Sequence, residues 1–122
     1  MFRQLYRLIN NRNLHTSSVL QNKIYTDTHE WLVKTENYTK IGLSKYAVDE
    51  MGEIIYIDYT DQKEVEKDEE IITLESIKAA ADVRSPFDGT ILEVNTNLQD
   101  NLELINSNPE CEDNCWLIKI KA

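Results

Sequence analysis

A single lysine, Lys78, lies between two runs of residues that favour β-strands. The first run is 70–75 and the second is 79–83, which the turn residues Ser85-Pro86 follow. A lysine between two short strands is expected at the exposed tip of a β-hairpin. At such a tip, a modifying enzyme can reach the side-chain amine, and a group tethered to that amine can move between active sites. Because turn residues are usually polar, an ordinary solvated lysine is the alternative that the rest of the chain has to exclude.

The residue types give little support for phosphate binding, nucleophilic catalysis or a metal site. The three glycines form neither a G-x-x-x-x-G-K nor a G-x-G-x-x-G phosphate loop. His29 is the only histidine after residue 23, and nothing in the sequence pairs it with a nucleophile. Cys111 and Cys115 lack the further ligands of a zinc site, so two free thiols and no metal are expected. The sequence favours a carrier module, whose chemistry belongs to an attached cofactor and to partner enzymes, over an enzyme acting alone.

The first 23 residues differ in composition from the rest of the chain. They contain four basic residues, several hydroxyl residues and no carboxylate, and the first acidic residue is Asp27. An arginine-rich segment without acids, whose apolar residues can form one helix face, is typical of a mitochondrial transit peptide. Its arginines interrupt the apolar residues, which excludes a membrane span. The sequence therefore predicts a transit peptide at 1–23, cleaved near Gln21-Asn22, and a matrix location. A basic tail without a targeting role is the alternative.

The rest of the chain is strongly acidic. The complete chain has 13 basic and 22 acidic residues, a net charge of −9. Residues 1–23 hold four of the basic residues and none of the acidic ones, so their removal leaves nine against 22 and a net charge of −13. Nucleic-acid binding needs clustered lysine and arginine, so that class of partner is excluded. An acidic surface favours docking on basic surfaces of partner proteins, with plain solubility as the alternative.

Residues 24–122 have the pattern of one mostly β domain. Runs of β-branched and aromatic residues predict strands at 31–36, 39–43, 53–59, 70–75, 79–83, 90–94 and 116–120. Lys45 to Met51 is expected to form a short helix, with Ser44 as its N-cap and Gly52 after its last turn. Short strands in this number predict a small β-sandwich or barrel.

Three local expectations follow from the same pattern. In the strand at 53–59, alternation places Ile55, Ile57 and Tyr59 on one face. The asparagine-rich stretch 95–101 is expected to be a turn. Residues 102–105 are expected to form one further helical turn, so the domain should contain one or two short helices.

Several motifs, in a fixed order, resemble the H protein family of the glycine cleavage system, whose members carry lipoate. The E-S-x-K-A motif around Lys78 is only a moderate signal alone, but the matches span about residues 25 to 121. The matching motifs are Thr28-His29-Glu30-Trp31, Ile41-Gly42-Leu43, Met51-Gly52-Glu53-Ile54-Ile55-Tyr56, Glu75-Ser76-Ile77-Lys78-Ala79, Gly89 to Asn95, Leu104-Ile105-Asn106 and Trp116 to Ile120.

The resemblance implies a fold and a set of partners. The fold is the sandwich-barrel hybrid of lipoyl and biotinyl domains, with lipoate linked as an amide to Lys78 and with Glu75, Ser76 and Ala79 completing the lysine motif. The implied partners are glycine decarboxylase (P protein), a folate-dependent aminomethyltransferase (T protein), dihydrolipoamide dehydrogenase (L protein) and a lipoylating enzyme. In this scheme the chain takes an aminomethyl group from the decarboxylase to the aminomethyltransferase, because a long arm reaches several active sites at high effective concentration.

The family also implies a cleft that shelters the loaded arm. The matching positions here are Thr28, Glu30 and Asp82, where two carboxylates would give a protonated amine charge-assisted hydrogen bonds. An ordinary strand-edge carboxylate at Glu30 and an ordinary turn residue at Asp82 are the alternatives. One departure concerns the loop before the hairpin, where the family usually has a glycine and this chain has Glu66-Lys67-Asp68-Glu69. Either a strained residue near Asp68 or a different shape of this turn is therefore expected.

Three other functions stay open from the sequence. A family member can mainly relay lipoate to other mitochondrial complexes, and the residues barely separate that role from glycine cleavage. A lipoyl or biotinyl domain of a larger complex is disfavoured, because the Pro/Ala-rich linkers of such proteins are absent and Ile77 and Ala79 stand where biotin carriers have methionines. An unmodified β-sandwich binding protein is the third alternative.

Overall fold

The computed structural model describes residues 23–122, so the predicted transit segment lies outside the described residues except for Lys23. The strands are β1 (Lys23–Tyr25), β2 (Glu30–Lys34), β3 (Thr39–Leu43), β4 (Ile54–Tyr59), β5 (Glu64–Val65), β6 (Glu70–Ser76), β7 (Ala80–Arg84), β8 (Gly89–Val94) and β9 (Ile118–Lys121). The helices are α2 (Lys45–Met51), α3 (Thr96–Asp100) and α4 (Leu102–Ser107).

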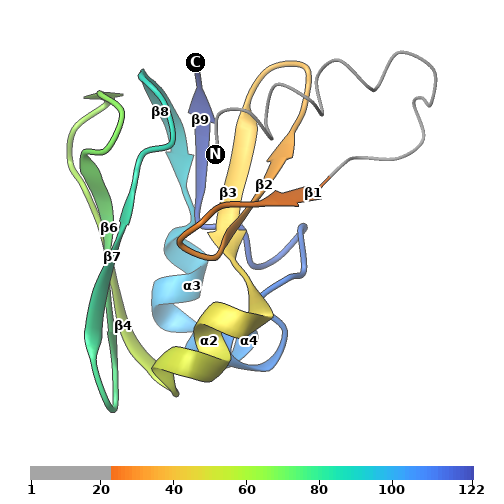
Figure 1. Cartoon of the computed structure of the whole chain (residues 1–122), viewed down its shortest axis with the longest axis vertical. Coiled ribbons are helices and arrows are strands. Elements are labelled where there is room, and N and C mark those ends of the chain that lie inside the picture. The colour runs from red at the N-terminus through yellow and green to blue at the C-terminus, as the bar shows by residue number, and fades with distance from the viewer. Residues whose placement is uncertain (1–22) are drawn as a thin grey trace.

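The strands form two antiparallel sheets that face each other (Figure 1). One sheet has six strands in the order β1-β2-β3-β9-β8-β5, and the other has three in the order β4-β6-β7. The mostly β sandwich predicted from the sequence is confirmed, and the two sheets do not close into a barrel. The core lies between them and is made chiefly of isoleucine, leucine and valine side chains. Burial of these side chains is the main stabilising contribution in a domain of this size.

Two expectations from the sequence fall short of the structure. Residues 95–101, expected to be a turn, form the third short helix among residues 23–122, because the fully buried Leu98 anchors α3 to the core. The charged stretch 61–69, where no strand was predicted, contributes the two-residue strand β5 to the edge of the larger sheet, where Val65 is buried.

The predicted faces of β4 are also wrong, because the strand contains a β-bulge. The register of β4 against β6 shifts between Ile54 and Tyr56. An extra residue in one strand moves the following side chains to the other face. As a result, Ile54 and Ile57 both point into the core, with 1% and 2% of their surfaces exposed, while Ile55 and Tyr56 are exposed to solvent.

The outer edge of β4 is covered by side chains of the two helices after β8. Asn106 of α4 accepts a hydrogen bond from the backbone N–H of Ile54 (2.8 Å) and donates one to its carbonyl (3.0 Å). Gln99 of α3 donates to the carbonyl of Ile57 (2.9 Å). An uncovered sheet edge can pair with another chain, so these amides protect the edge of the smaller sheet and hold the helices against it.

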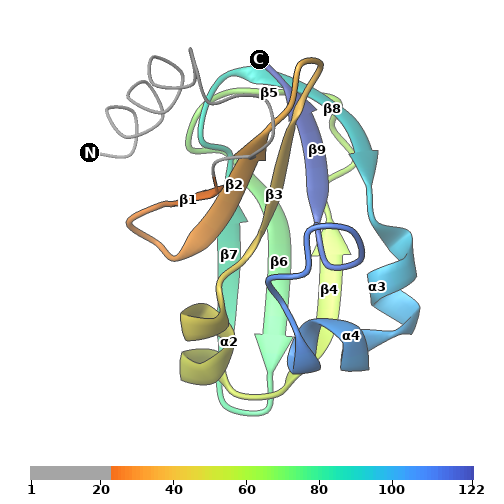
Figure 2. The same ribbon diagram turned by 90° about the vertical axis from the view of Figure 1, so that its right-hand side faces the viewer.

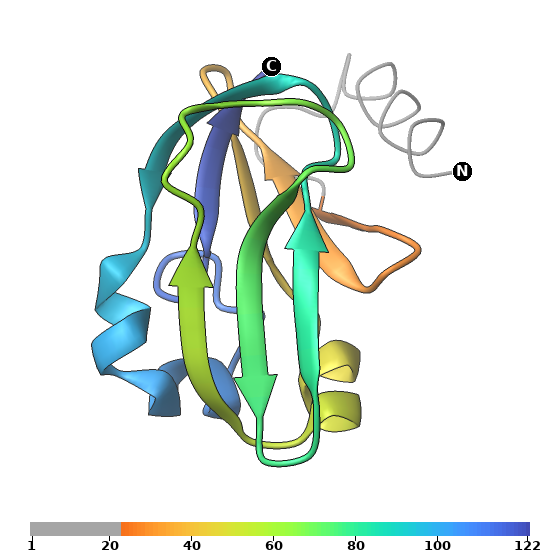
Figure 3. The same cartoon turned by 90° about the vertical axis from the view of Figure 1, so that its left-hand side faces the viewer.

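Helix α2 leads the chain from the larger sheet to the smaller one. Ser44 caps it as predicted, with its hydroxyl accepting a hydrogen bond from the N–H of Ala47 (3.1 Å). Gly52 ends it with a φ of 86°, a conformation that favours glycine. The β6–β7 hairpin projects at the same end of the molecule as α2 and α4, and the C-terminus lies at the opposite end (Figures 2 and 3). Among residues 23–122, no helix has the length and apolar character needed to cross a membrane.

The strained residue expected in the loop before β6 is Asp68, whose φ is 72°. Its N–H donates to the carbonyl of Ser85 (2.8 Å), and its own carbonyl accepts a hydrogen bond from Arg84 (3.1 Å). The left-handed conformation is therefore held in place by the chain segment after β7. It costs an L-residue roughly 1–2 kcal/mol, and glycine avoids this cost.

We expect Asp68→Gly to be more stable than Asp68→Ala by about 1 kcal/mol in urea unfolding, because only glycine relieves the positive φ. Asp61 is a matched control, since it is an exposed loop aspartate without a positive φ. There the alanine variant should equal or exceed the glycine variant in stability. The same order of stabilities at both positions would contradict this explanation.

Candidate functional site

Lys78 lies in the short connection between β6 and β7, at the tip of the hairpin. The N–H of Ser76 donates to the carbonyl of Ala79 (2.8 Å), so the tip consists of residues 77–79. Ile77 is 65% exposed, and Lys78 and Ala79 are exposed as well. With residues 23–122, the ammonium group of Lys78 makes neither a hydrogen bond nor an ion pair. The predicted hairpin position is thus confirmed, and the amine is directed to solvent.

The hydroxyl of Ser76 organises the tip. Its oxygen accepts hydrogen bonds from the backbone N–H groups of Lys78 (3.1 Å) and Ala79 (3.0 Å). The same hydroxyl donates to the carbonyl of Met51, at the end of α2 (2.6 Å). Ser76 itself is buried, so its hydroxyl relies on these protein groups for its hydrogen bonds. The serine of the lysine motif therefore fixes the backbone of the turn, while the lysine side chain stays free.

Gly52 leaves room beside the lysine stem. A Cβ atom at position 52 would lie 3.0 Å from Cε of Lys78 and 3.7 Å from Cγ1 of Ile77. The backbone N–H of Ile77 also donates to the carbonyl of Glu53 (3.0 Å). The tip is therefore tied to the α2–β4 connection at two places, while the glycine allows the lysine stem to lie along that connection.

The remaining motif residue, Glu75, lies one position before Ser76 on β6. Pairing of Glu75 with Tyr56 on one side and Ala80 on the other places it on the outer face of the smaller sheet. Its side chain is exposed. The structure therefore brings Glu75, Ser76 and Ala79 together around Lys78.

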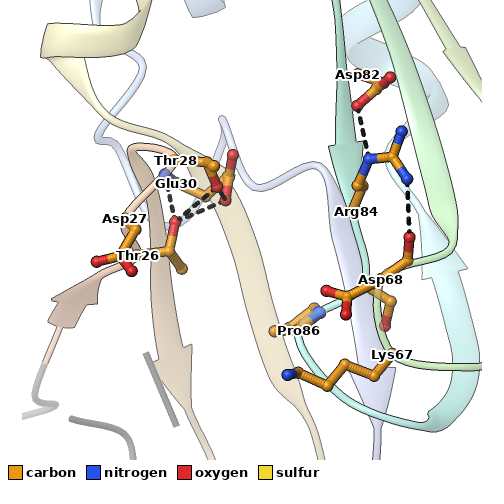
Figure 4. Close-up of a pocket in the computed structure, with 10 residues that line it drawn as sticks. Thr26, Asp27, Thr28, Glu30, Lys67, Asp68, Asp82, Arg84 and Pro86 are labelled. Carbon is orange, nitrogen blue, oxygen red and sulfur yellow. Dashed lines mark hydrogen bonds and ion pairs between the residues drawn. The ribbon is translucent and has the colours of Figure 1, made fainter. Parts of the chain in front are cut away.

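A second region lies between the start of β2 and the free side of β7. Two adjoining pockets there, with volumes of about 380 and 310 Å³, are both lined by Thr28, Glu30 and Asp82. Figure 4 shows the first of them, with Glu30 and its threonines on one wall and Asp82 on the other. Asp82 is four residues beyond Lys78, which corresponds to roughly 13 Å along a strand. The three residues predicted for the cleft thus line one hollow, and their role in binding an arm stays a prediction.

Glu30 is buried at the start of β2, and its carboxylate is already hydrogen-bonded. One carboxylate oxygen accepts hydrogen bonds from the hydroxyls of Thr26 and Thr28, both at 2.6 Å. Burial raises the pKa of Glu30 above its usual value, although these hydrogen bonds act in the opposite direction. The turn before it is closed by His29, whose φ is 71° and whose N–H donates to the carbonyl of Thr26 (3.0 Å). His29 thus has a backbone role, and its ring packs against that of Tyr46.

Asp82 has a different environment from Glu30. It pairs with Thr73, which places it on the outer face of the smaller sheet, and Nε of Arg84 donates to its carboxylate (3.3 Å). Arg84 also lies 3.9 Å from Glu70. The sequence reasoning missed both Arg84 and Thr26 as partners of the cleft carboxylates. The only signals in the sequence were their spacings of two residues from Asp82 and four from Glu30.

The two cysteines lie away from this region, in the loop between α4 and β9. Cys111 is half-buried and Cys115 is buried, and both are free thiols. Burial raises the pKa of the Cys115 thiol to about 11, so it is neutral at physiological pH. Its sulfur donates to the carbonyl of Leu104 (3.3 Å). Within residues 23–122, no group of three or more histidine, cysteine or acidic side chains could hold a metal ion.

The fold is that of a small two-sheet β domain with a lysine on an exposed hairpin, and it has a counterpart among solved structures. A glycine cleavage system H protein from Mycobacterium marinum matches with a TM-score of 0.74 at 24% identity, over 84% of this chain and 85% of that one. At this identity the similarity supports the fold alone.

The sequence comparisons identify the family. The family model described as "Glycine cleavage H-protein" matches residues 23–122. The glycine cleavage system H protein of Thermotoga maritima is 41% identical over 100 residues, which cover 81% of this chain and 79% of the relative. A probable glycine cleavage system H protein 1 of Saccharolobus solfataricus is 42% identical over 106 residues, covering 85% and 76%. The chain belongs to the glycine cleavage H-protein family.

We expect Ser76→Ala to lower the free energy of unfolding by about 1–3 kcal/mol, because three backbone groups lose a hydrogen-bond partner at a partly buried position. Amide hydrogen exchange at Lys78 and Ala79 should accelerate at the same time. Ser107→Ala is the control, since that exposed hydroxyl only bonds carbonyls within its own helix. Unchanged exchange at the two amides would show that Ser76 does not hold the tip.

We expect Glu30→Gln to become increasingly stabilising, relative to the parent, as the pH rises above about 4.5. The folded pKa of Glu30 lies above its unfolded value, so the folded state binds this proton more tightly and its contribution to stability is lost as pH rises. Urea unfolding of both proteins from pH 4 to 7 measures the difference.

Glu110 provides a control of opposite sign for this titration. Its pKa is lowered, with hydrogen bonds from Tyr25 and from the Lys45 N–H outweighing partial desolvation. Its contribution is therefore present at neutral pH and lost as pH falls, so Glu110→Gln should become more destabilising as pH rises. If the difference in unfolding free energy between Glu30→Gln and the parent stays constant with pH, the pKa of the buried carboxylate is not raised by folding.

Proposed function

We propose that this chain is the lipoyl-carrying shuttle of a glycine cleavage system, with lipoate attached as an amide to Nζ of Lys78. The observation that carries the proposal is the solvent-directed amine of Lys78 on a turn whose backbone is fixed by Ser76. Membership of the glycine cleavage H-protein family supports the same conclusion. A carrier needs an attachment point that enzymes can reach and a rigid base for the attached group, and the tip provides both.

The residues around Lys78 fit such a group. Gly52 leaves space along the lysine stem that a Cβ would fill. No residue from 23 to 122 forms a hydrogen bond or an ion pair with the Lys78 amine. When attached, lipoate would supply a redox-active dithiolane that accepts an aminomethyl group and later needs reoxidation. The chain itself contributes the attachment point, the rigid turn and the neighbouring pockets. In this proposal it serves as a carrier subunit and leaves catalysis to its partner enzymes.

Thr28, Glu30 and Asp82 are proposed to shelter the far end of the arm. Their pockets begin on β7, the strand that leads away from the tip, so an arm on Lys78 can fold back along it. Glu30 is desolvated and would attract a cationic amine more strongly than a carboxylate in water. Because Arg84 already contacts Asp82, a cationic amine would have to compete with the guanidinium for that carboxylate.

The proposed partners are the glycine decarboxylase that loads the arm, the folate-dependent aminomethyltransferase that unloads it and dihydrolipoamide dehydrogenase. A lipoylating enzyme is needed first. The excess of acidic over basic residues supports electrostatic steering toward basic docking surfaces on these enzymes. We also propose a mitochondrial matrix location, supported by the basic, acid-free composition of residues 1–23.

We expect Lys78→Arg to abolish acylation while leaving stability unchanged to within about 0.5 kcal/mol, because the side chain lies in solvent. Co-expression with a lipoylating enzyme, followed by intact-mass measurement and urea unfolding, tests both parts. Lys45→Arg is the matched control at another exposed lysine and should still gain the full lipoyl mass. A lipoyl increment on the Lys78→Arg protein would place the attachment point elsewhere.

A further inference from the structure

Three exposed apolar side chains surround the tip of the β6–β7 hairpin. Ile55 and Tyr56 of β4 and Ile77 of the tip are 50%, 47% and 65% exposed. Two exposed carboxylates, Glu53 and Glu75, stand among them. These five residues are called the tip patch below. Large apolar side chains gathered on a surface mark interaction sites more often than scattered ones do.

The backbone geometry assembles the tip patch from two strands. The β-bulge turns both Ile55 and Tyr56 outward, where regular alternation would have buried one of them. Tyr56 pairs with Glu75, and the N–H of Ile77 bonds to the carbonyl of Glu53 (3.0 Å). The patch is therefore built on rigid elements that are hydrogen-bonded to one another, next to Lys78.

The face that carries the tip patch has no cover within the described chain. Figure 3 views the smaller sheet from outside, and no segment of residues 23–122 lies over β4, β6 or β7. The helices pack against the other side and the edge of this sheet, through Gln99 and Asn106. An uncovered face with exposed isoleucines beside the attachment lysine is available to a partner.

We infer that the tip patch is the docking surface for the enzyme that acylates Lys78, an inference that rests on the proposed function. The short reach of the unmodified lysine side chain identifies this partner. Before modification, only the short lysine stem separates Nζ from the turn, so the acylating enzyme must contact the residues beside Lys78. After modification, the attached arm carries the reactive end away from the tip, and later partners can bind elsewhere.

The chemistry of Lys78 acylation determines which groups the acylating enzyme must supply. The Lys78 ammonium loses a proton to a base of the enzyme, and the neutral Nζ attacks the carbonyl carbon of an acyl adenylate. An amide bond forms to Nζ, which releases a second proton to the departing phosphate. The bond from the acyl carbon to that phosphate oxygen breaks, and the departing nucleotide takes the electron pair. An enzyme that holds an acyl adenylate, with its anionic phosphate, needs basic residues near its active site.

Charge complementarity supports the same partner. The exposed carboxylates Glu53 and Glu75 belong to the tip patch. Asp49 and Glu50 are also exposed, on α2 shortly before Gly52, and Asp49 is paired with Lys45 (3.1 Å). A surface with apolar contacts at its centre and acidic groups around them fits an enzyme face with an apolar hollow and a basic rim. Such a basic rim would speed the association of the enzyme with the acidic surface, and contacts with the isoleucines would slow dissociation of the complex.

The test uses the full chain, purified without modification, with a lipoate–protein ligase, lipoate and ATP. We expect Ile55→Ser combined with Ile77→Ser to lower kcat/KM for acylation of Lys78 at least tenfold, chiefly through KM. Leu92→Ser is the matched control, because Leu92 is also 50% exposed but lies on β8 in the other sheet. It should change kcat/KM less than twofold. Acetylation of Lys78 by a small succinimidyl ester should be equal in all these proteins.

A second variant isolates the charge contribution. Glu53→Gln with Glu75→Gln should make kcat/KM less dependent on salt concentration, because two carboxylates leave the interface. Ile55→Ser alone, measured with circular dichroism, replaces the double variant if the latter fails to fold.

The outcomes separate this inference from the proposed function. Acylation of the Ile55→Ser and Ile77→Ser protein at the parental rate would overturn the docking surface while leaving the carrier role intact. Equal losses in enzymatic and succinimidyl-ester acylation would also overturn it, because they would indicate a changed turn. A parent protein that the ligase does not acylate at Lys78 would overturn the proposed function and the inference together.

Discussion

The hydroxyl of Ser76 is the contact on which the proposed site depends. A hairpin connection that carries an exposed lysine has little apolar surface of its own to hold its shape. Ser76 holds the backbone conformation of this turn, since it accepts hydrogen bonds from two amides of the turn and donates one to the carbonyl of Met51. The backbone beneath Lys78 is thereby fixed to the end of α2, and the flexibility that a carrier requires is confined to the side chain.

The two sheets place this tip and the neighbouring pockets at related positions. The smaller sheet carries Lys78 at its end and Asp82 on its free strand. The larger sheet contributes Glu30 at the start of β2, and Thr28 lies in the turn before that strand. The core between the sheets holds the two walls of the hollow in register. In the proposed function, the fold separates the attachment point from the sheltering pockets and joins them by β7, which suits an arm that alternates between solvent and protein.

Local sequence patterns predicted the parts of the structure that local physics decides. The hairpin around Lys78 and the Ser44 cap follow from residue types over a few positions, and both are confirmed. The strain at Asp68 was expected from the family's usual glycine in that loop, and the positive φ of Asp68 agrees with it. Tertiary contacts decided the rest. The bulge in β4 inverts the expected faces of Ile54 and Ile55, and burial of Leu98 converts an expected turn into α3. The roles of the pocket residues were predicted from family resemblance, and the hydrogen bonds that occupy Glu30 and Asp82 could not be read from spacing.

The most direct test of the account is the state of Lys78 in protein purified from its natural source. Trypsin cleaves after unmodified lysine, so a lipoylated Lys78 should leave one peptide spanning 68–84 with a lipoyl mass increment. We expect this peptide to dominate, in a protein whose N-terminus lies near residue 22. Complete cleavage into unmodified peptides 68–78 and 79–84 would contradict the central claim that Lys78 carries lipoate.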